Sequence, residues 1–150
     1  MSNYLEIVDA VMERLRLSCH DVKRIEELSD IQDILEYSQT APALLVYYDG
    51  DDVPTGTGSS GGQGSVHIVN QRIVVIVVVR SSVGQASQTG VRRAAGELLG
   101  SVISALSGWQ PTRAHRPLVR TTAPRPDYLP GVGFVPVAFT AQRTTVACQP

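Results

Sequence analysis

The stretch that most constrains the fold is an unbroken run of seven β-branched residues, Ile73 to Val79. Such side chains are stiff at χ1, so they fit a pleated sheet better than a helix. Because no polar residue interrupts the run, neither face of this strand can be turned to water. The run therefore predicts a central strand that the rest of the chain covers on both faces.

The strand pattern extends outward to Val66–Arg80, and this extent raises a problem of length. One straight strand would measure ~45 Å at ~3.3 Å per residue, whereas a compact domain of this size has a diameter near ~40 Å. We therefore expect the strand to bend at a bulge in Asn70–Arg72 or to protrude. Ile73–Val79 would form the core, while Val66–Arg72 would lie at a sheet edge or reach another chain.

Two apolar patterns at helical spacing precede the central strand. The first runs from Tyr4 to Leu15 and predicts an amphipathic helix capped by Ser2 or Asn3. The second, in residues 30–38, predicts a shorter helix that Pro42 closes. Its side chains expected to face inward are Ile31, Ile34 and Leu35.

Further strands and a long loop are expected around these helices. Residues 22–28 fit a short edge strand or an irregular crossing. Ala43–Tyr48 fits a short buried strand that ends at the turn residues Asp49 and Gly50. Residues 50–65 are rich in glycine and serine, so we expect a flexible loop between neighbouring antiparallel strands.

This loop contains the pattern GxGxxG, which in dinucleotide-binding proteins lies between a strand and a helix. Here a β-branched strand pattern follows it instead of a helix. The preceding Asp49, Asp51 and Asp52 would also repel a phosphate. Both observations favour a loop over a nucleotide site.

A long helix is expected to cover one face of the central strand, and the first helix the other. Gly108 is its expected C-cap, and Trp109 is expected to plug the end of the contact. Gly96 and Gly100 would allow close approach to the sheet or to a neighbour. Residues 90–107 place eight apolar side chains on one stripe at helical period: Val91, Ala94, Ala95, Leu98, Leu99, Val102, Ile103 and Leu106.

The last part of the chain reads strand, loop, strand. Residues 117–122 predict a strand, and residues 122–132 form a proline-rich loop that cannot continue a ladder. Residues 133–146 predict the last strand, with Pro136 marking it as an edge strand or marking its start. Residues 146–150 are expected to fray.

Together these elements predict one α+β domain, residues 1–150. Its mixed, mainly antiparallel sheet of about four to five strands would be flanked by an N-terminal helix, a short helix and a long helix. Cys19 and Cys148 are expected to remain thiols in a reducing cytoplasm, since no signal-like segment precedes Tyr4. The longest apolar run is far shorter than the ~20 residues that cross a bilayer, so we expect no membrane contact.

Apart from the GxGxxG pattern, which lacks the strand–helix context of a nucleotide site, the sequence contains no motif for catalysis, metal binding or cofactor binding. His20, His67 and His115 are far apart, and none has a second ligand at metal spacing. The acids of DGDD lack the closing glutamate of a calcium loop, and no GxSxG elbow is present. We therefore expect no catalytic residue, no metal and no cofactor. A small cytoplasmic α+β enzyme or ligand-binding domain remains an alternative class.

Charge is distributed unevenly, although the net charge is only -1. Residues 1–65 hold four basic and twelve acidic side chains, a net of -8, while residues 66–150 hold nine and two, a net of +7. All basic residues except Lys23 are arginines, which are enriched in protein interfaces. The asymmetry fits either two solvated faces of one fold or complementary faces on neighbouring subunits. The balanced total disfavours general DNA binding.

The order of these segments resembles the phage tail terminator (tail completion) family, nearest to its Mu-like type. The resemblance spans roughly residues 4–145. It rests on the strand APALLVYYDGDD, the helix GVRRAAGELLGSVISALSGWQP and the segment RPLVRTTAPRPDYLPGVGFVPVAFTAQRTT. It implies a structural virion protein of the tail neck, assembled in the host cytoplasm, without a reaction or a cofactor.

The resemblance also implies partners. Copies of the chain would form a hexameric ring that caps the tail tube, ends its polymerisation and offers a surface to the head connector. The partners would be the tail tube protein and a head-completion or connector protein, and DNA would pass through the lumen without specific binding. Another ring protein of the phage neck is the nearest alternative.

A ring of this kind needs contacts between copies and mobile segments that order against partners, for which we expect residues 50–65 and 122–132. We expect some acids of residues 1–65 to face the channel. The candidate subunit or partner interface residues are Asp49, Asp51, Asp52, His67, Arg72, Arg113, Arg116, Arg120, Arg125 and Tyr128.

Overall fold

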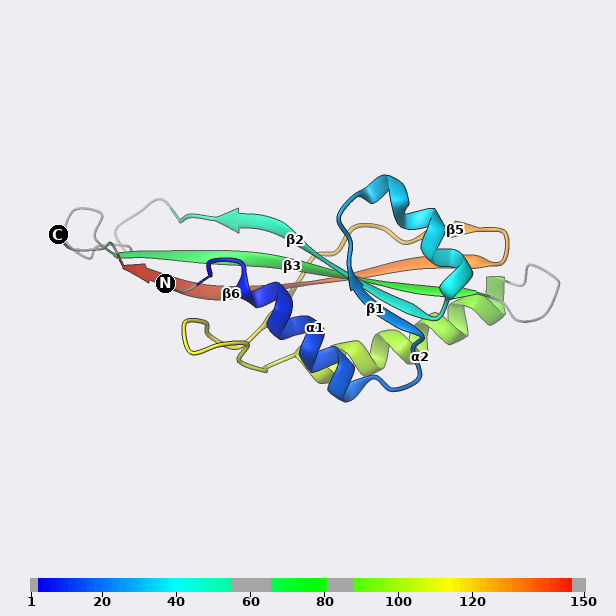
Figure 1. Ribbon diagram of the computed structural model, residues 1–150, viewed down its shortest axis with the longest axis horizontal. Helices are drawn as coiled ribbons and strands as arrows, with labels where there is room; N and C mark the ends of the chain where they lie inside the picture. Colours follow the sequence, from blue (N-terminus) through cyan, green and yellow to red (C-terminus); the bar gives the residue numbers. More distant parts are fainter. Residues whose placement is uncertain (1–2, 55–65, 81–87, 147–150) are drawn as a thin grey trace.

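A mixed sheet with helices on both faces forms the protein, as the computed structural model shows for residues 3–54, 66–80 and 88–146 (Figure 1). The α+β class predicted from the sequence is confirmed. The helices are α1 (Glu6–Ser18), the 3-10 helix η1 (Ile31–Thr40) and α2 (Gln88–Leu106). The strands are β1 (Arg24–Glu27), β2 (Ala43–Asp52), β3 (Val66–Arg80), β4 (Val119–Thr121), β5 (Asp127–Leu129) and β6 (Val132–Val146).

The six-stranded sheet has the order β1-β2-β3-β6-β4, and β5 pairs with a separate part of β6. β1 runs parallel to β2, and the other pairs are antiparallel. The edge strand expected in residues 22–28 is present as β1. The sheet has more strands than expected because β5 lies inside the predicted proline-rich loop, where Pro126 and Pro130 flank it without interrupting its pairing.

The central strand β3 is continuous, and its 15 residues pair in register with β6. The bulge expected at Asn70–Arg72 is therefore wrong. The irregularity lies in β2, where Asp49 and Gly50 together face Arg72. Gly50 has a φ of +86°, a left-handed conformation that glycine adopts at little steric cost. This bulge lets β2 continue to Asp52 instead of ending at Asp49 and Gly50 as predicted.

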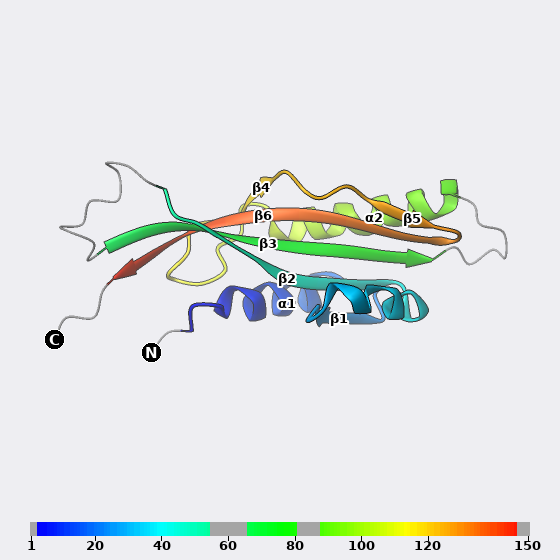
Figure 2. The same cartoon turned by 90° about the horizontal axis from the view of Figure 1, so that it is seen from above.

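The predicted protrusion of the strand is present. Figures 1 and 2 show β3 and β6 extending past α1 and α2 at one end of the molecule. We call Val66–Arg72 together with Thr140–Val146 the projecting ladder, since these segments pair with each other throughout. Among the described residues Val66–Val69 pair only with β6, so this part of β3 is a sheet edge, as expected, whereas Asn70–Arg72 lie between β2 and β6.

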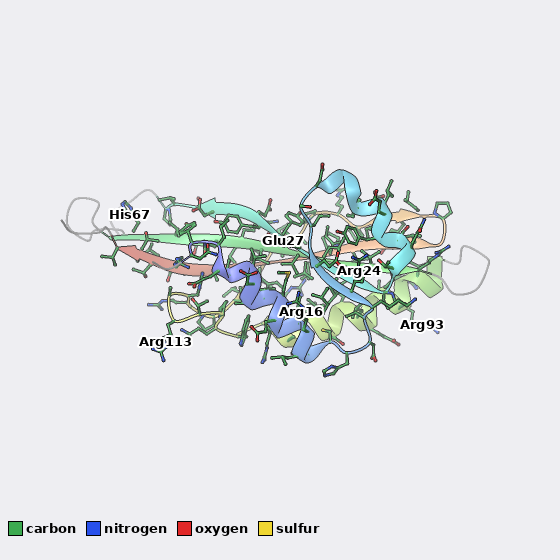
Figure 3. The ribbon with its side chains drawn as sticks, in the orientation of Figure 1. Arg16, Arg24, Glu27, His67, Arg93 and Arg113 are labelled. Carbon is green, nitrogen blue, oxygen red and sulfur yellow. The ribbon has the colours of Figure 1, made fainter. Side chains whose placement is uncertain are left out.

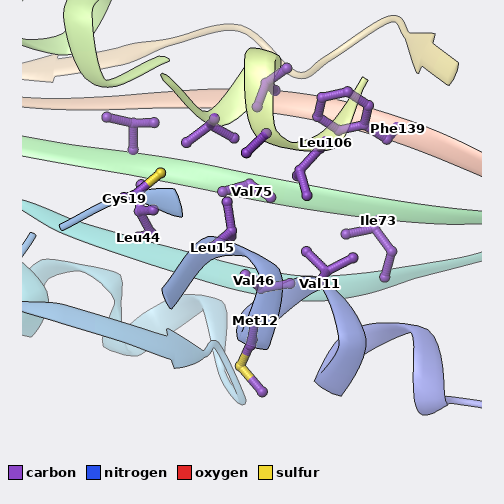
Figure 4. Packing of buried hydrophobic residues seen from close by; sticks show 14 of the residues in the cluster. Val11, Met12, Leu15, Cys19, Leu44, Val46, Ile73, Val75, Leu106 and Phe139 are labelled. Atoms are coloured by element: carbon purple, nitrogen blue, oxygen red, sulfur yellow. The ribbon is translucent and has the colours of Figure 1, made fainter. Parts of the chain in front are cut away.

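Both α-helices pack on the same face of the sheet, so the expectation that α1 covers the opposite face is wrong. One apolar cluster joins Val11 and Leu15 of α1 and Leu106 of α2 to Ile73 and Val75 (Figure 4). The opposite face is covered mainly by η1, which lies above the sheet in Figure 1. The residues of this second cluster include Leu28, Ile34, Tyr37, Val74, Ile76 and Val78.

The first two helices differ from expectation at their ends and inner faces. α1 begins at Glu6, and no side chain caps it. Asn3 acts in the turn just before the helix, where its Oδ1 accepts a hydrogen bond from the backbone N–H of Leu5 at 3.0 Å. In η1, Ile34 packs against the core as predicted, but Leu35 is 55% exposed. The side chain of Ile31 lies outside the described part of the structure.

The long helix α2 ends as predicted, and Gly108 has a φ of +74°. Trp109 is half-buried against the core, and the guanidinium of Arg14 lies 5.4 Å from its ring centre. Within the predicted apolar stripe Ala94 is exposed, and Ala105 is buried instead.

The close approach predicted at Gly96 and Gly100 is not made within the chain, because a Cβ at either position would meet nothing within 4 Å. The close contact occurs at Gly133 instead. A Cβ there would lie 2.7 Å from Cγ1 of Val91. The first turn of α2 thus packs directly on the backbone of β6.

The C-terminal strands correct two expectations. Pro136 lies in an inner strand, β6. Its position falls between the two segments of β6 that pair with β4 and with β5, so no described strand lies beside it on that side. A residue without an N–H is tolerated there because no neighbouring strand needs its hydrogen bond. Val146, expected to fray, pairs with Val66. Residues 55–65, with the GxGxxG pattern, and residues 147–150 lie outside the described residues. None of the described helices is long and apolar enough to span a membrane.

Candidate functional site

The first candidate surface is the outer edge of β2 in the half of the sheet that projects. β1 pairs with β2 only as far as Val46, after which the N–H of Leu28 donates a last hydrogen bond to the Val46 carbonyl at 2.8 Å. Beyond that point no described strand continues β1. We call Tyr47–Asp52 the β2 edge. It carries three exposed acids, Asp49, Asp51 and Asp52.

Arg72 links the β2 edge to the other side of the sheet. Its Nε donates to Oδ2 of Asp49 at 2.7 Å, and its Nη2 donates to the carbonyl of Thr122 at 2.7 Å. Both side chains of the ion pair are partly exposed, so the pair stabilises the fold by at most about 1 kcal/mol. A cavity of about 370 Å³ lies over this pair. It is lined by Asp49, Gly50, Asp51, Asp52, Asn70, Arg72, Thr121 and Thr140.

Asp51 faces the opposite side of the sheet from Asp49, where it accepts a hydrogen bond from the hydroxyl of Tyr4. Burial, and then this contact with Asp51, raises the pKa of Tyr4 well above its ordinary value. Burial also raises the pKa of Tyr48, which neighbours both groups. Both hydroxyls therefore stay protonated; that of Tyr4 donates to Asp51, and that of Tyr48 accepts from Nε2 of Gln71 at 3.5 Å.

The second candidate surface is the opposite margin of the sheet. There β4, β5 and the segment before them expose Arg113, Arg116, Arg120 and Arg125. Three apolar side chains accompany the arginines: Val119 is 63% exposed, Tyr128 40% and Leu129 41%. We call these seven residues the arginine edge. Arginine and tyrosine around an apolar centre is a composition typical of protein interfaces.

The strand order places the acidic and the basic parts of the sequence toward opposite margins of the sheet. The acidic first part of the chain builds α1, β1, η1 and β2. The basic second part builds β3, α2, β4, β5 and β6. In Figure 2 β2 and β4 lie at opposite margins of the sheet, with β3 and β6 between them. The two candidate edges are therefore both opposite in charge and opposite in position.

The predicted interface residues thus form two surfaces rather than one. Asp49, Asp51, Asp52 and Arg72 gather at the β2 edge, and the other arginines with Tyr128 follow the arginine edge. His67 belongs to neither surface. It is exposed at the end of the projecting ladder (Figure 3), and its carbonyl accepts a hydrogen bond from the Thr145 hydroxyl at 3.3 Å.

Sequence reasoning missed a buried polar cluster beneath the projecting ladder. Gln71, His115 and Arg143 are almost fully buried. His115 Nε2 lies 2.6 Å from Oε1 of Gln71, and His115 Nδ1 lies 2.6 Å from Oγ1 of Thr112. Burial first, and the charge of Arg143 second, lower the pKa of His115.

Arg143 joins this cluster to the start of α1. Its Nη1 donates to Oε1 of Glu6 at 3.1 Å, and its guanidinium lies 5.3 Å from the ring centre of Tyr4. The hydroxyl of Thr112 approaches the same Glu6 oxygen at 3.4 Å. The cluster thus fastens the N-terminal turn and the segment carrying Arg113 and Arg116 onto the ladder.

The described residues bring no catalytic or metal-binding group together. No set of three or more histidine, cysteine, aspartate or glutamate side chains among them could hold a metal ion. Cys19 is a buried free thiol whose pKa is raised by burial. The described residues form an α+β fold with two exposed edges of opposite charge.

The comparisons show the family to which the chain belongs. A family model described as phage tail terminator protein matches residues 1–146, and the chain belongs to this family. The family resemblance found in the sequence is therefore confirmed, while its Mu-like type stays a prediction. The protein is a structural component of the phage tail and not an enzyme.

The fold also occurs in solved structures, of which 31 chains match. One of them is a chain of the virion of a native gene transfer agent particle. It is 15% identical, the match covers 94% of this chain and 95% of that chain, and the TM-score is 0.58. This likeness shows a shared fold. No curated protein matches the chain.

Proposed function

We propose that copies of this protein form a ring, hexameric as in the family it resembles, that caps the tail tube and ends its polymerisation. The observation that carries the proposal is the placement of opposite charges on opposite edges of one sheet. A ring requires contacts between two different surfaces of each subunit, related by a rotation that closes. The β2 edge and the arginine edge are two such surfaces.

The ring then offers one face to the tail tube protein and the other to a head-completion or connector protein. The projecting ladder supports this division, because it extends beyond the helices and carries His67 at its tip. Its interior is fixed by the cluster of Gln71, His115 and Arg143, so it can present a preformed surface.

DNA passes through the lumen of this ring without specific binding. A channel of this kind must not hold phosphate groups, and acidic side chains repel them. Asp9 and Glu13 on the exposed side of α1 are acids of the first half that do not belong to the β2 edge. We assign such exposed acids to the channel wall.

The test combines native mass spectrometry of the purified protein with a polymerisation assay of tail tube protein. We expect a discrete closed oligomer. It should stop tube growth when one ring is added for each growing tube. A protein that remains monomeric, alone and with tube protein, would refute the proposal. A ring that leaves tube growth unchanged would instead favour another ring protein of the neck.

A further inference from the structure

We propose that strand β4 of one copy pairs with the β2 edge of the next copy, so that the sheets of neighbouring copies join into one continuous sheet. This inference rests on the proposed ring and specifies how its subunits meet. Both strands have an outer edge that no described strand occupies. An open strand edge carries unpaired N–H and C=O groups, and a strand of another chain can satisfy them.

The register places the two open edges at the same level along the sheet. Asp52 pairs with Asn70, Asn70 pairs with Gln142, and the carbonyl of Gln142 accepts a hydrogen bond from Arg116 at 2.8 Å. A second row of pairs crosses the sheet in the same way: Tyr48 pairs with Ile73, Ile73 with Phe139, and Phe139 with Arg120. The β4 edge of one copy can therefore dock on the β2 edge of the next without a large shift along the strands. The only shift needed is the stagger that any closed sheet has between its strands. A contact without a large shift favours a ring over a helical filament.

The strand directions also fit. From β2 through β3 and β6 to β4 each neighbour is antiparallel to the previous strand, so β2 and β4 run in opposite directions. A rotation about an axis roughly along the strands keeps the direction of every strand. The β4 of one copy then meets the β2 of the next as an antiparallel pair, like the pairs inside the subunit.

The chemistry of the two edges is complementary. Asp52 is exposed on the β2 edge and forms no ion pair within the described residues. Arg116 is exposed at the matching level of the opposite edge. A cavity of about 410 Å³, lined by Glu27, Leu28, Ser29, Tyr47 and Tyr48, marks the place where β1 leaves the β2 edge. In this register the exposed Val119 of an incoming β4 lies one position from the residue level with Tyr48, so it can be buried at the margin of this hollow.

A cysteine pair tests the contact directly. Residues opposite each other on paired antiparallel strands have Cα atoms about 4.5–5.5 Å apart, within the range of about 4.4–6.8 Å that a disulfide spans. The variant with Asp52→Cys and Arg116→Cys, in a Cys19→Ala and Cys148→Ser background, is oxidised and run on a denaturing gel. We expect a ladder of covalent oligomers ending at the full ring. The matched control, His67→Cys with Arg93→Cys, places cysteines at opposite ends of the molecule and should give no ladder (Figure 3).

A charge exchange provides the second, independent test. Asp52→Arg alone and Arg116→Glu alone should each lose the ring in native mass spectrometry, while the variant with both substitutions should regain it. Two results together would overturn the strand pairing: rings that form in every charge variant, and no disulfide-linked oligomers from the cysteine pair. The proposed function would still stand. Absence of a ring in the unmodified protein would instead overturn the proposed function itself.

Discussion

His115 Nε2 lies 2.6 Å from Oε1 of Gln71 inside the projecting ladder. The Gln71 amide nitrogen donates to the Tyr4 carbonyl at 2.9 Å, so its oxygen is the acceptor and His115 Nε2 carries the proton. His115 Nδ1 lies 2.6 Å from Oγ1 of Thr112, whose hydroxyl also approaches Oε1 of Glu6 at 3.4 Å. Burial, and then the charge of Arg143, lower the pKa of His115 and favour its neutral form.

The first prediction concerns pH. Burial, with a smaller effect of Arg143, lowers the pKa of folded His115 below its ordinary 6.5. In the unfolded chain the imidazole regains that value, so below it the unfolded state binds a proton that the folded state resists. The free energy of unfolding should therefore decrease as pH falls below 6.5 and be insensitive to this group at higher pH.

Urea denaturation at pH values between about 5 and 8 measures this dependence. His115→Gln should remove much of it. His67→Gln is the matched control, because His67 is exposed and should leave the dependence unchanged. An equal pH dependence in both variants would contradict the assignment to His115.

The second prediction concerns Gln71. Gln71→Leu leaves both the Nε2–H of His115 and the Tyr4 carbonyl without the partner that Gln71 supplies. We expect a loss of about 1–3 kcal/mol in the free energy of unfolding, the cost of a buried polar group left unsatisfied. Thr144→Val, at an exposed position of β6, should change it by less than about 0.5 kcal/mol in the same urea experiment. A Gln71→Leu variant as stable as the parent would argue against the cluster.

The third prediction compares two glycines. Gly133→Ala brings a methyl group to 2.7 Å from Cγ1 of Val91, so we expect a loss of about 1–3 kcal/mol. A methyl group at Gly100, on the exposed face of α2, would have no atom within 4 Å. Because alanine favours the helix, Gly100→Ala should raise the free energy of unfolding by up to about 1 kcal/mol. Thermal unfolding of both variants measures the difference. Similar shifts for the two would refute the close packing of α2 on β6.

The fourth prediction concerns the arginine edge. Replacing Arg113, Arg116 and Arg120 together by glutamate reverses its charge, and like charges would then face each other across the proposed contact. We expect loss of the ring in size-exclusion chromatography with light scattering. Arg92→Glu with Arg93→Glu, on the exposed side of α2, is a control with two of the same substitutions and should keep the ring. Unchanged rings in the triple variant would rule out this edge as the interface.

The strongly periodic parts of the fold were predictable from the sequence. The β-branched run located β3, and the apolar stripe located α2 with its end at Gly108. The side on which α1 packs was not predictable, because both faces of β3 are equally apolar and offer no preference to a helix. β5 was missed because prolines flank it closely, although none falls among its paired residues.

The candidate edges and the buried cluster differ in how far the sequence could reveal them. The acids and arginines of the edges could be chosen from charge alone, but their division between two margins depends on the strand order. Gln71 was expected only as part of a bulge, and nothing singled out Arg143. Their partners are remote in the chain: His115 is 44 residues from Gln71, and Glu6 is 137 residues from Arg143. Such long-range pairing leaves no local pattern. The one available signal was the position of Gln71 two residues before Ile73, which places it on the core-facing side of β3.

The bulge at Asp49 and Gly50 has a consequence for the isolated chain. A bare strand edge invites stacking with another identical edge, the first step toward fibrils. The kink at Gly50 disturbs the flat template, and two β2 edges brought together would set Asp49, Asp51 and Asp52 against their own copies. We therefore expect two β2 edges to repel each other while a basic strand can still pair with one of them, which would limit aggregation of the free subunit.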